Sequence, residues 1–388
     1  MIMKIDTQIR GSNPLRSRNR NRQAVLGSLQ AAGTMGRAEI GRSLGLTTQA
    51  ASNIIAELLA DGLIEEKGAR VSGRGLPAVQ YGLNPKGAYA FGVEIRPDAI
   101  FTALLDLSGT RIATKRTNLR DNTPEAVSTH VLRLRDAMLA SSSVSMNAIL
   151  GTGIVMPGPF GDTGLSGRSS DLQGWENVDA LPLFKETLGG VVELSNDANA
   201  AALSENLTGL AQGISCYAYI YFGRGLGLGI VQDGRLVSGA FGNAGEVGHI
   251  PVHGPGGPVP LESLLSRDSI QAFIGCEEPL DLDQLSELFS ARDPRLIDWL
   301  DRAAMALGHA VLTLENLLDP QTIILGGAMP PELIDHLISG CPLPAGSVAN
   351  RNDNLLPRLQ RGACGRLTAT LGAASLVLHS AFTPITVS

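Results

Sequence analysis

The chain has 388 residues, 44% of them hydrophobic, so it is long enough for two or three domains with packed cores. It contains no run of about 18 apolar residues, which argues against a membrane-spanning helix, and its first residues include no apolar stretch of signal-peptide length. Four cysteines without a CxxC pair argue against a disulfide scaffold. We therefore expect a cytoplasmic protein with no membrane partner.

Charge is unevenly distributed along the chain. Residues 1–86 contain 12 Lys and Arg against 6 Asp and Glu, whereas the remainder contains 19 against 31. A basic N-terminal part on an acidic body is typical of a nucleic-acid-binding module joined to a domain that need not contact DNA. On charge alone, a solvated N-terminal tail is the alternative.

Three helices are predicted in the basic part, after the arginine-rich arm RSRNRNR. Apolar residues recur at helical spacing in NRQAVLGSLQAAG, GRAEIGRSLG and LTTQAASNIIAELLADG, and each segment ends at a glycine. The next segment, LIEEKGARVSGRGLPAVQYGLN, predicts two strands around a Gly-rich tip. We therefore predict a winged helix-turn-helix domain over residues 1–86, with a basic N-terminal arm.

The third predicted helix begins with short polar residues, the part of a recognition helix that faces base edges in the major groove. The residues predicted to contact bases are Thr48, Gln49, Ser52 and Asn53. At the tip between the strands, Arg74 is predicted to enter a narrow minor groove. Six further arginines are predicted to contact phosphates: Arg16, Arg18, Arg20, Arg22, Arg37 and Arg42. A winged helix that binds protein is the alternative.

The sequence of the acidic body, residues 87–388, predicts strands and helices in alternation. Three antiparallel strands are expected within 88–119, a helix near 123–140, a strand at 149–158 and further strands within 216–240 around an Asp233-Gly234 hairpin turn. A long helix near 297–318, the strand TIILGG and a terminal helix from about 366 follow. We predict two α/β lobes around a cleft: residues 87–195, completed by the helix at 366–380, and residues 196–365.

Polar side chains in three stretches are predicted to face this cleft: Asn196, Asp197, Glu246, His249 and Glu262. Carboxylates, an amide and an imidazole can each bond neighbouring hydroxyl groups of a polyhydroxylated ligand. Each also has a structural alternative. Asn196 or Asp197 could cap the following helix, His249 could be a structural histidine, and Glu262 could favour the dipole of the helix it starts.

The motifs GIVMPGP, SNDANAAALSE, GIVQDGRLVSGAFGNAGEVGH and PQTIILGGA resemble successive motifs of the ROK (repressor, open reading frame, kinase) family. The resemblance covers nearly the whole chain and implies the two-lobed, actin-like fold of the sugar kinase superfamily, which is ribonuclease H-like. It also implies a sugar in the cleft and an oligomeric regulator that responds to it. Carried over by position, the five polar residues of the cleft would bind the sugar, and Asp197 falls where ROK kinases have their catalytic base.

The chain departs from the kinase pattern at the phosphate-binding loops. Where ROK kinases have Asp-x-Gly-Gly-Thr, this chain has Glu94 followed by Arg96, Pro97 and Asp98. Proline lacks an N–H group and Asp98 adds negative charge, so both oppose binding of a polyphosphate by backbone amides. The second loop has Arg224 in place of the threonine of Gly-Thr-Gly. Phosphoryl transfer depends mainly on positioning and charge neutralisation, so we expect no kinase activity and no cofactor.

The family also commonly carries zinc, held by the histidine of its Gly-His motif and three cysteines. The matching segment GPGGPVPLE contains no cysteine, so we predict no metal.

These features predict a sugar-responsive transcriptional repressor without catalytic activity, whose partners are operator DNA, a sugar effector and further copies in a homodimer or homotetramer. An ATP-dependent sugar kinase with a fused DNA-binding domain is the alternative. A third hypothesis keeps the DNA-binding part but makes the body a sensor of another protein.

Overall fold

The computed structural model describes residues 14–70, 77–158, 172, 174–175, 178–254 and 256–384, with side chains from residue 17 onward. These residues form two compact units. The first contains the chain up to Gly87 together with the residues from His379 onward, and the second is Ala88–Leu378. No helix in the described part of the chain combines the length and the apolar character needed to cross a lipid bilayer.

The first unit consists of three helices and a small antiparallel sheet. The helices are α1 (Pro14–Ala32), α2 (Arg37–Ser43) and α3 (Thr48–Ala60). The sheet has the order β1-β3-β2, formed by Met35–Gly36, Ala78–Leu83 and Ile64–Arg70. Val25, Leu29, Ile40 and Leu58 are fully buried between these elements, as their helical spacing requires. Because α1 begins at Pro14, the basic segment RSRNRNR forms its first turns.

The end of the C-terminal helix α11 (Thr368–Phe382) belongs to the first unit, whereas its earlier residues belong to the second. In the first unit, the Gln23 side chain donates from Nε2 to the carbonyl oxygen of Ser380 at 2.8 Å. A Cβ atom at Gly27 would lie 2.6 Å from the carbonyl oxygen of Phe382, so only glycine permits this approach. The two ends of the chain therefore share one core.

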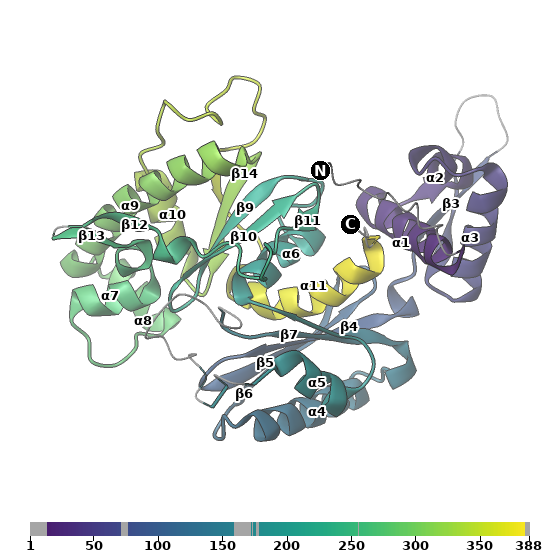
Figure 1. Cartoon of the computed structure of the whole chain (residues 1–388), viewed down its shortest axis with the longest axis horizontal. Helices are drawn as coiled ribbons and strands as arrows, with labels where there is room; N and C mark the ends of the chain where they lie inside the picture. The colour runs from purple at the N-terminus through teal and green to yellow at the C-terminus, as the bar shows by residue number, and fades with distance from the viewer. Residues whose placement is uncertain are drawn as a thin grey trace, which may run out of the picture. The chain divides into compact units, whose positions relative to one another are not determined.

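The second unit contains two five-stranded sheets (Figure 1). The first sheet has the order β6-β5-β4-β7-β8, in which β4, β5 and β6 form an antiparallel meander and β7 and β8 run parallel to β4. These strands are β4 (Tyr89–Ile95), β5 (Ala99–Asp106), β6 (Arg111–Asn118), β7 (Ile149–Val155) and β8 (Val192–Ser195). On one face, Phe91 and Val93 pack with residues of α4 (Pro124–Ser141) and α5 (Ala180–Leu188).

The second sheet has the order β11-β10-β9-β14-β15. Its strands are β9 (Tyr217–Phe222), β10 (Leu226–Gln232), β11 (Arg235–Leu236), β14 (Thr322–Gly327) and β15 (Leu359–Arg361). Asp233 and Gly234 both have positive φ, as the predicted hairpin turn between β10 and β11 requires. Ile220 and Phe222 on one face join a core with four helices: α7 (Arg267–Ile274), α8 (Leu282–Ser290), α9 (Pro294–Leu318) and α10 (Pro331–Gly340).

Helices α6 (Asp197–Thr208) and α11 lie between the two sheets (Figure 1). Glycines permit this close packing, since a Cβ atom at Gly153 of β7 would lie 1.7 Å from the carbonyl oxygen of Ala373. A Cβ atom at Gly372 would lie 2.0 Å from the carbonyl oxygen of Ala200. A small hairpin of β12 (Pro251–Gly254) and β13 (Gly257–Pro260) leads into α7. The mixed α/β architecture predicted from the sequence is confirmed.

Candidate functional site

A cavity of about 600 Å³ lies in the second unit where strands of both sheets end. Pro157 and Gly158 reach it after β7, and Asn196 and Asp197 reach it after β8. The turn between β9 and β10 contributes the opposite wall. The cavity brings together all five residues predicted to bind a sugar: Asn196, Asp197, Glu246, His249 and Glu262. The volume of the cavity and the polar groups that line it suit a small ligand.

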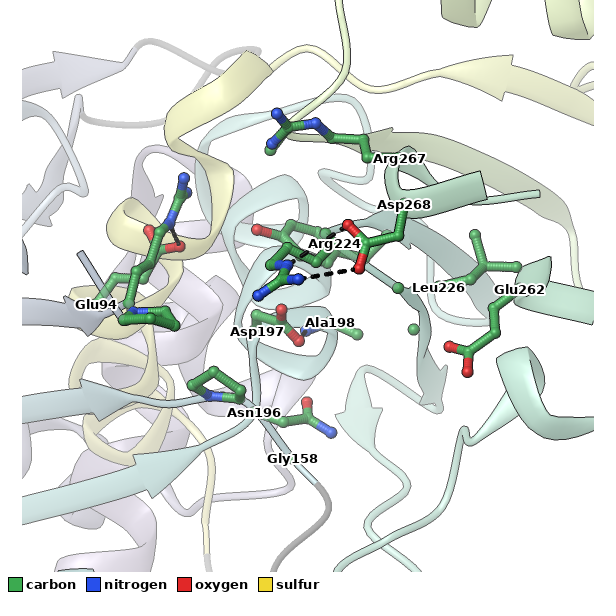
Figure 2. Close-up of a pocket in the computed structure, with 18 of the residues that line it drawn as sticks. Glu94, Gly158, Asn196, Asp197, Ala198, Arg224, Leu226, Glu262, Arg267 and Asp268 are labelled. Atoms are coloured by element: carbon green, nitrogen blue, oxygen red, sulfur yellow. Dashed lines mark hydrogen bonds and ion pairs between the residues drawn. The ribbon is translucent and has the colours of Figure 1, made fainter. Parts of the chain in front are cut away.

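Two polar residues, Asn196 and Asp197, stand at the start of α6, and Asn196 is the one that caps it. The Oδ1 atom of Asn196 accepts from the backbone N–H of Asn199 at 2.8 Å, which makes Asn196 the N-cap. Asp197 accepts from the adjacent N–H of Ala198, at 2.9 Å from Oδ1, and from its own backbone N–H. Figure 2 shows the Asp197 carboxylate in the middle of the cavity, with Glu94 on one side and Glu262 on the other. The capping alternative therefore describes Asn196, whereas the Asp197 carboxylate faces the cavity.

The environment of Asp197 favours its neutral form. Burial and the nearby Glu94 carboxylate raise the pKa of Asp197 to about 7, against an ordinary value of 3.8. The N–H of Ala198 and the Arg96 guanidinium act in the opposite direction and limit the rise. A carboxyl with a pKa near neutrality can accept a hydrogen bond or a proton from a ligand hydroxyl.

Glu246, His249 and Glu262 form a cluster on the other side of the cavity. His249 Nε2 lies 3.6 Å from Glu246 Oε2, and His249 Nδ1 lies 3.9 Å from Glu262 Oε1. The absence of a side chain at Gly225 leaves room for the Glu262 carboxylate, since a Cβ atom there would be 2.7 Å from Glu262 Oε2. The imidazole is thus held between two carboxylates, an arrangement that offers several acceptors and one donor to a polyol.

Glu262 was expected at the start of a helix, but it lies in a 3₁₀ turn at Leu261–Ser263, and α7 begins only at Arg267. The α-helix starts later because Ser266 caps it, accepting from the N–H of Ser269 at 3.0 Å. The turn leaves the Glu262 carboxylate at the cavity wall.

The zinc ion that the family resemblance implies does not fit these residues. None of the four cysteines lines the cavity, and His249 has two carboxylates as its charged neighbours. Within the described ranges, no group of three or more His, Cys, Asp and Glu residues could hold a metal ion. Structural zinc requires four ligands, usually including thiolates.

An ion pair occupies the segment that corresponds to the first phosphate-binding loop. Glu94 is buried and accepts from Arg96 Nε at 2.6 Å and from the Thr370 hydroxyl of α11. The Arg96 guanidinium lies over the ring of Phe101, 4.5 Å from its centroid. Two contacts therefore fix the Arg96 cation at the cavity wall, where a kinase would offer backbone amides, and Thr370 holds its partner Glu94.

Sequence reasoning did not identify two further charged groups of the cavity, Arg267 and Asp268 at the start of α7. Asp268 binds Arg224 of the β9–β10 turn, with Oδ1 3.4 Å from Nε and Oδ2 3.3 Å from Nη2 (Figure 2). Arg267 lies beside this pair and donates from Nη2 to the carbonyl oxygen of Leu280 at 2.7 Å. Nothing in the local sequence marks these residues, because they meet the cavity only after folding.

In the first unit, the predicted base-contacting residues are on the first turns of α3. Thr47 caps this helix, accepting from the N–H of Ala50 at 3.2 Å. The exposed side chains of Gln49 and Asn53 bond each other, Nε2 to Oδ1 at 2.9 Å. Ser52 donates to the carbonyl oxygen of Thr48 at 2.8 Å. Arg74 falls outside the described residues, so its predicted groove contact stays a prediction.

Two of the arginines predicted to contact phosphates have partners within the protein. Arg18 pairs with Glu57 of α3 at 2.7 Å, and Arg22 pairs with both Glu57 and Asp61, the residue that follows α3. The side chains of Arg20, Arg37 and Arg42 are exposed, and Arg37 donates to the Tyr81 hydroxyl at 3.3 Å; the side chain of Arg16 is not described. Any DNA contact by Arg18 or Arg22 would therefore compete with an existing ion pair.

The chain has a mixed α/β fold, and its residues 90–379 match the model of the ROK family, so it belongs to this family. The xylose repressor of Bacillus spizizenii is 23% identical over 92% of this chain and 95% of that protein. A glucokinase of Halalkalibacterium halodurans is 31% identical over 61% of this chain and 79% of that protein. A ROK family transcriptional regulator, a homologue of the E. coli MLC protein, has a similar fold, with a TM-score of 0.72 at 22% identity, over 95% of this chain and 98% of that one.

The predicted family and its sugar-kinase-like fold are thus confirmed. The relatives include a repressor that matches 92% of this chain and a kinase that matches 61% of it.

Proposed function

We propose that this protein is a DNA-binding transcriptional repressor whose ROK domain binds a sugar as effector without phosphorylating it. The cavity carries this proposal, because it joins Asp197, Glu246, His249 and Glu262, the groups that bind neighbouring hydroxyls, around one volume. The xylose repressor, similar over nearly the whole chain, supports the regulatory role.

The proposed DNA-binding module is the first unit, interpreted as a winged helix-turn-helix. Helices α2 and α3 with the antiparallel β2–β3 pair match that arrangement, and α3 presents an exposed Gln49–Asn53 pair at its start. The protein would act as a homodimer or homotetramer on a palindromic operator in the cytoplasm. A sugar that binds one lobe arrangement better than another would shift the population and change DNA affinity.

Loss of kinase activity is proposed from the Arg96-Pro97 segment. Arg96 is held by Glu94 and Phe101 at the wall where backbone amides would have to meet a polyphosphate. Proline at position 97 has no N–H to donate.

The experiment that tests this function combines operator selection from genomic DNA with fluorescence anisotropy on the full-length protein. A sugar panel should include one compound that lowers operator affinity at least tenfold. Asp197→Ala should keep DNA binding and lose the response, whereas Gln49→Ala with Asn53→Ala should lose DNA binding and keep sugar binding by calorimetry. Absence of specific DNA binding at physiological salt would refute the proposal.

The second candidate is an ATP-dependent sugar kinase with a fused DNA-binding domain. The raised pKa of Asp197, about 7 because of burial and Glu94, is favourable for a catalytic base, and a glucokinase is among the relatives. Sugar-dependent release of ADP from Mg-ATP, abolished by Asp197→Asn, would support this candidate over the first.

A further inference from the structure

The basic side of the cavity contains a guanidinium with incomplete bonding. Arg267 lines the cavity and makes no ion pair with any described residue. Its Nε atom is buried and has no hydrogen-bond partner within the part of the chain that the structure covers. A buried donor without a partner destabilises the folded chain, and more so when the group is charged. Such a group is retained at this cost where a ligand supplies the acceptor.

A second guanidinium lies close to the first. Arg96 and Arg267 both line this cavity, so two like charges share it. Burial and the Arg96 cation lower the pKa of Arg267, while the Asp268 carboxylate acts in the opposite direction. Glu94 compensates Arg96 through its 2.6 Å bond. The repulsion that remains would be relieved by an anion bound between the two side chains.

The other acids of this side already have partners. Asp268 binds Arg224, and Asp98 binds Arg116 at 3.2 Å. Asp281 caps α8, accepting from the N–H of Gln284 at 2.8 Å. The positive charge of Arg267 is therefore the one on this side that a described side chain does not pair.

Another part of the cavity wall has a different character, since Glu246, His249 and Glu262 suit hydroxyl groups. A ligand that satisfies both sides must carry hydroxyls at one end and an anionic group at the other. A cavity of about 600 Å³ has room for such a molecule.

We propose that the effector is an anionic sugar, carrying a phosphate ester or a carboxylate, whose charged group binds Arg267 and Arg96. This inference rests on the proposed function, because it assumes that the cavity binds a sugar at all. Guanidinium groups suit both anions, since their planar N–H groups match two oxygens at once. The hydroxyl groups of the sugar would reach Asp197 and the Glu246–His249–Glu262 cluster.

The test is isothermal titration calorimetry on the full-length protein at pH 7.5. The probes are glucose, mannose, galactose and N-acetylglucosamine, each with its 6-phosphate, together with glucuronate, galacturonate, inorganic phosphate and Mg-ATP. We expect one phosphate ester or uronate to bind at least tenfold tighter than its neutral parent. Phosphate esters and uronates form separate arms, so the preferred anion is identified by the arm that binds.

Arg267→Gln should reduce the affinity for that anionic sugar on the order of tenfold to a hundredfold and leave the neutral parent unchanged. The matched control is Arg302→Gln, because Arg302 is an exposed arginine of α9 that pairs with Asp298 at 2.9 Å. It should change neither affinity, and the melting temperatures of both variants show whether they fold.

Each of the remaining outcomes would refute the anionic effector, the proposed function or both. Neutral sugars could bind as tightly as their anionic forms, with the ratio of the two affinities unaltered in Arg267→Gln. That result would overturn the proposal of an anionic effector but not the proposal of a sugar-responsive regulator. Inorganic phosphate or Mg-ATP binding as the preferred ligand would overturn it as well. Binding of no sugar of either kind would overturn both this inference and the proposed function.

Discussion

The raised pKa of Asp197 determines how the stability of the ligand-free protein should depend on pH. This pKa is about 7 in the folded chain, because of burial and Glu94, and near the ordinary value of 3.8 once the chain unfolds. Between these values the folded protein keeps a proton that the unfolded chain has lost. The contribution of the Asp197 carboxyl to the free energy of unfolding is therefore complete below about pH 4 and is lost as the pH rises through 7.

The size of this effect follows from the shift. One pKa unit corresponds to about 1.4 kcal/mol, so the loss between pH 4 and 7 is at most about 4 kcal/mol, and water in the cavity reduces it. A change of 1 kcal/mol moves the melting temperature of a domain this large by about 2–4 °C. Asp197→Asn, which cannot ionise, should remove several degrees of the decline seen in the wild type between pH 5 and 7.5.

Differential scanning fluorimetry across this range measures the effect. Asp293→Asn is the control, since the Arg295 side chain lowers the pKa of Asp293 to about 2 and it stays ionised throughout. That variant keeps an N-cap oxygen for α9 but loses the ion pair with Arg295, so it should shift the whole curve without changing its slope. Parallel curves for wild type and Asp197→Asn would refute the assigned environment of Asp197.

Three further predictions concern packing, each measured as a change in urea midpoint or melting temperature. Gly153→Ala should destabilise the second unit severely, because its Cβ would lie 1.7 Å from a carbonyl oxygen of α11; Gly256→Ala, with nothing within 4 Å, should be neutral. Arg358→Ala should cost about 3–5 kcal/mol by leaving the buried Glu315 unpaired, and Arg358→Ala with Glu315→Gln should recover part of it. Phe382→Ala should cost about 3–5 kcal/mol in the first unit and weaken operator binding; unchanged proteolysis of that unit would contradict this.

Much of the fold could be predicted because its elements carry local signals. Alternating apolar residues and breaks at turns predict the meander now seen as β4, β5 and β6, and the apolar run before Leu318 predicts α9, which starts three residues earlier than expected, at Pro294. The sequence predicts the position of the terminal helix. It does not predict which face of α11 is buried, because small apolar residues surround the whole helix. The structure explains this composition: α11 packs between two sheets.

The five residues of the sugar hypothesis were predictable because motifs fix them in the sequence. Arg267 was not, since its significance depends on distance rather than on order along the chain. Arg96 was recognised only as a replacement in a loop, whereas the structure gives it partners in Glu94 and Phe101. A sequence cannot show which buried donor lacks an acceptor.

The sharing of α11 between both units constrains how this protein matures during translation. The residues of α1 leave the ribosome early, yet Gln23 and Gly27 wait for Ser380 and Phe382, which are made much later. The second unit waits for the same helix, because Thr370 of α11 binds the buried Glu94 and Ala373 packs against Gly153. Both units are therefore completed only when α11 has been made.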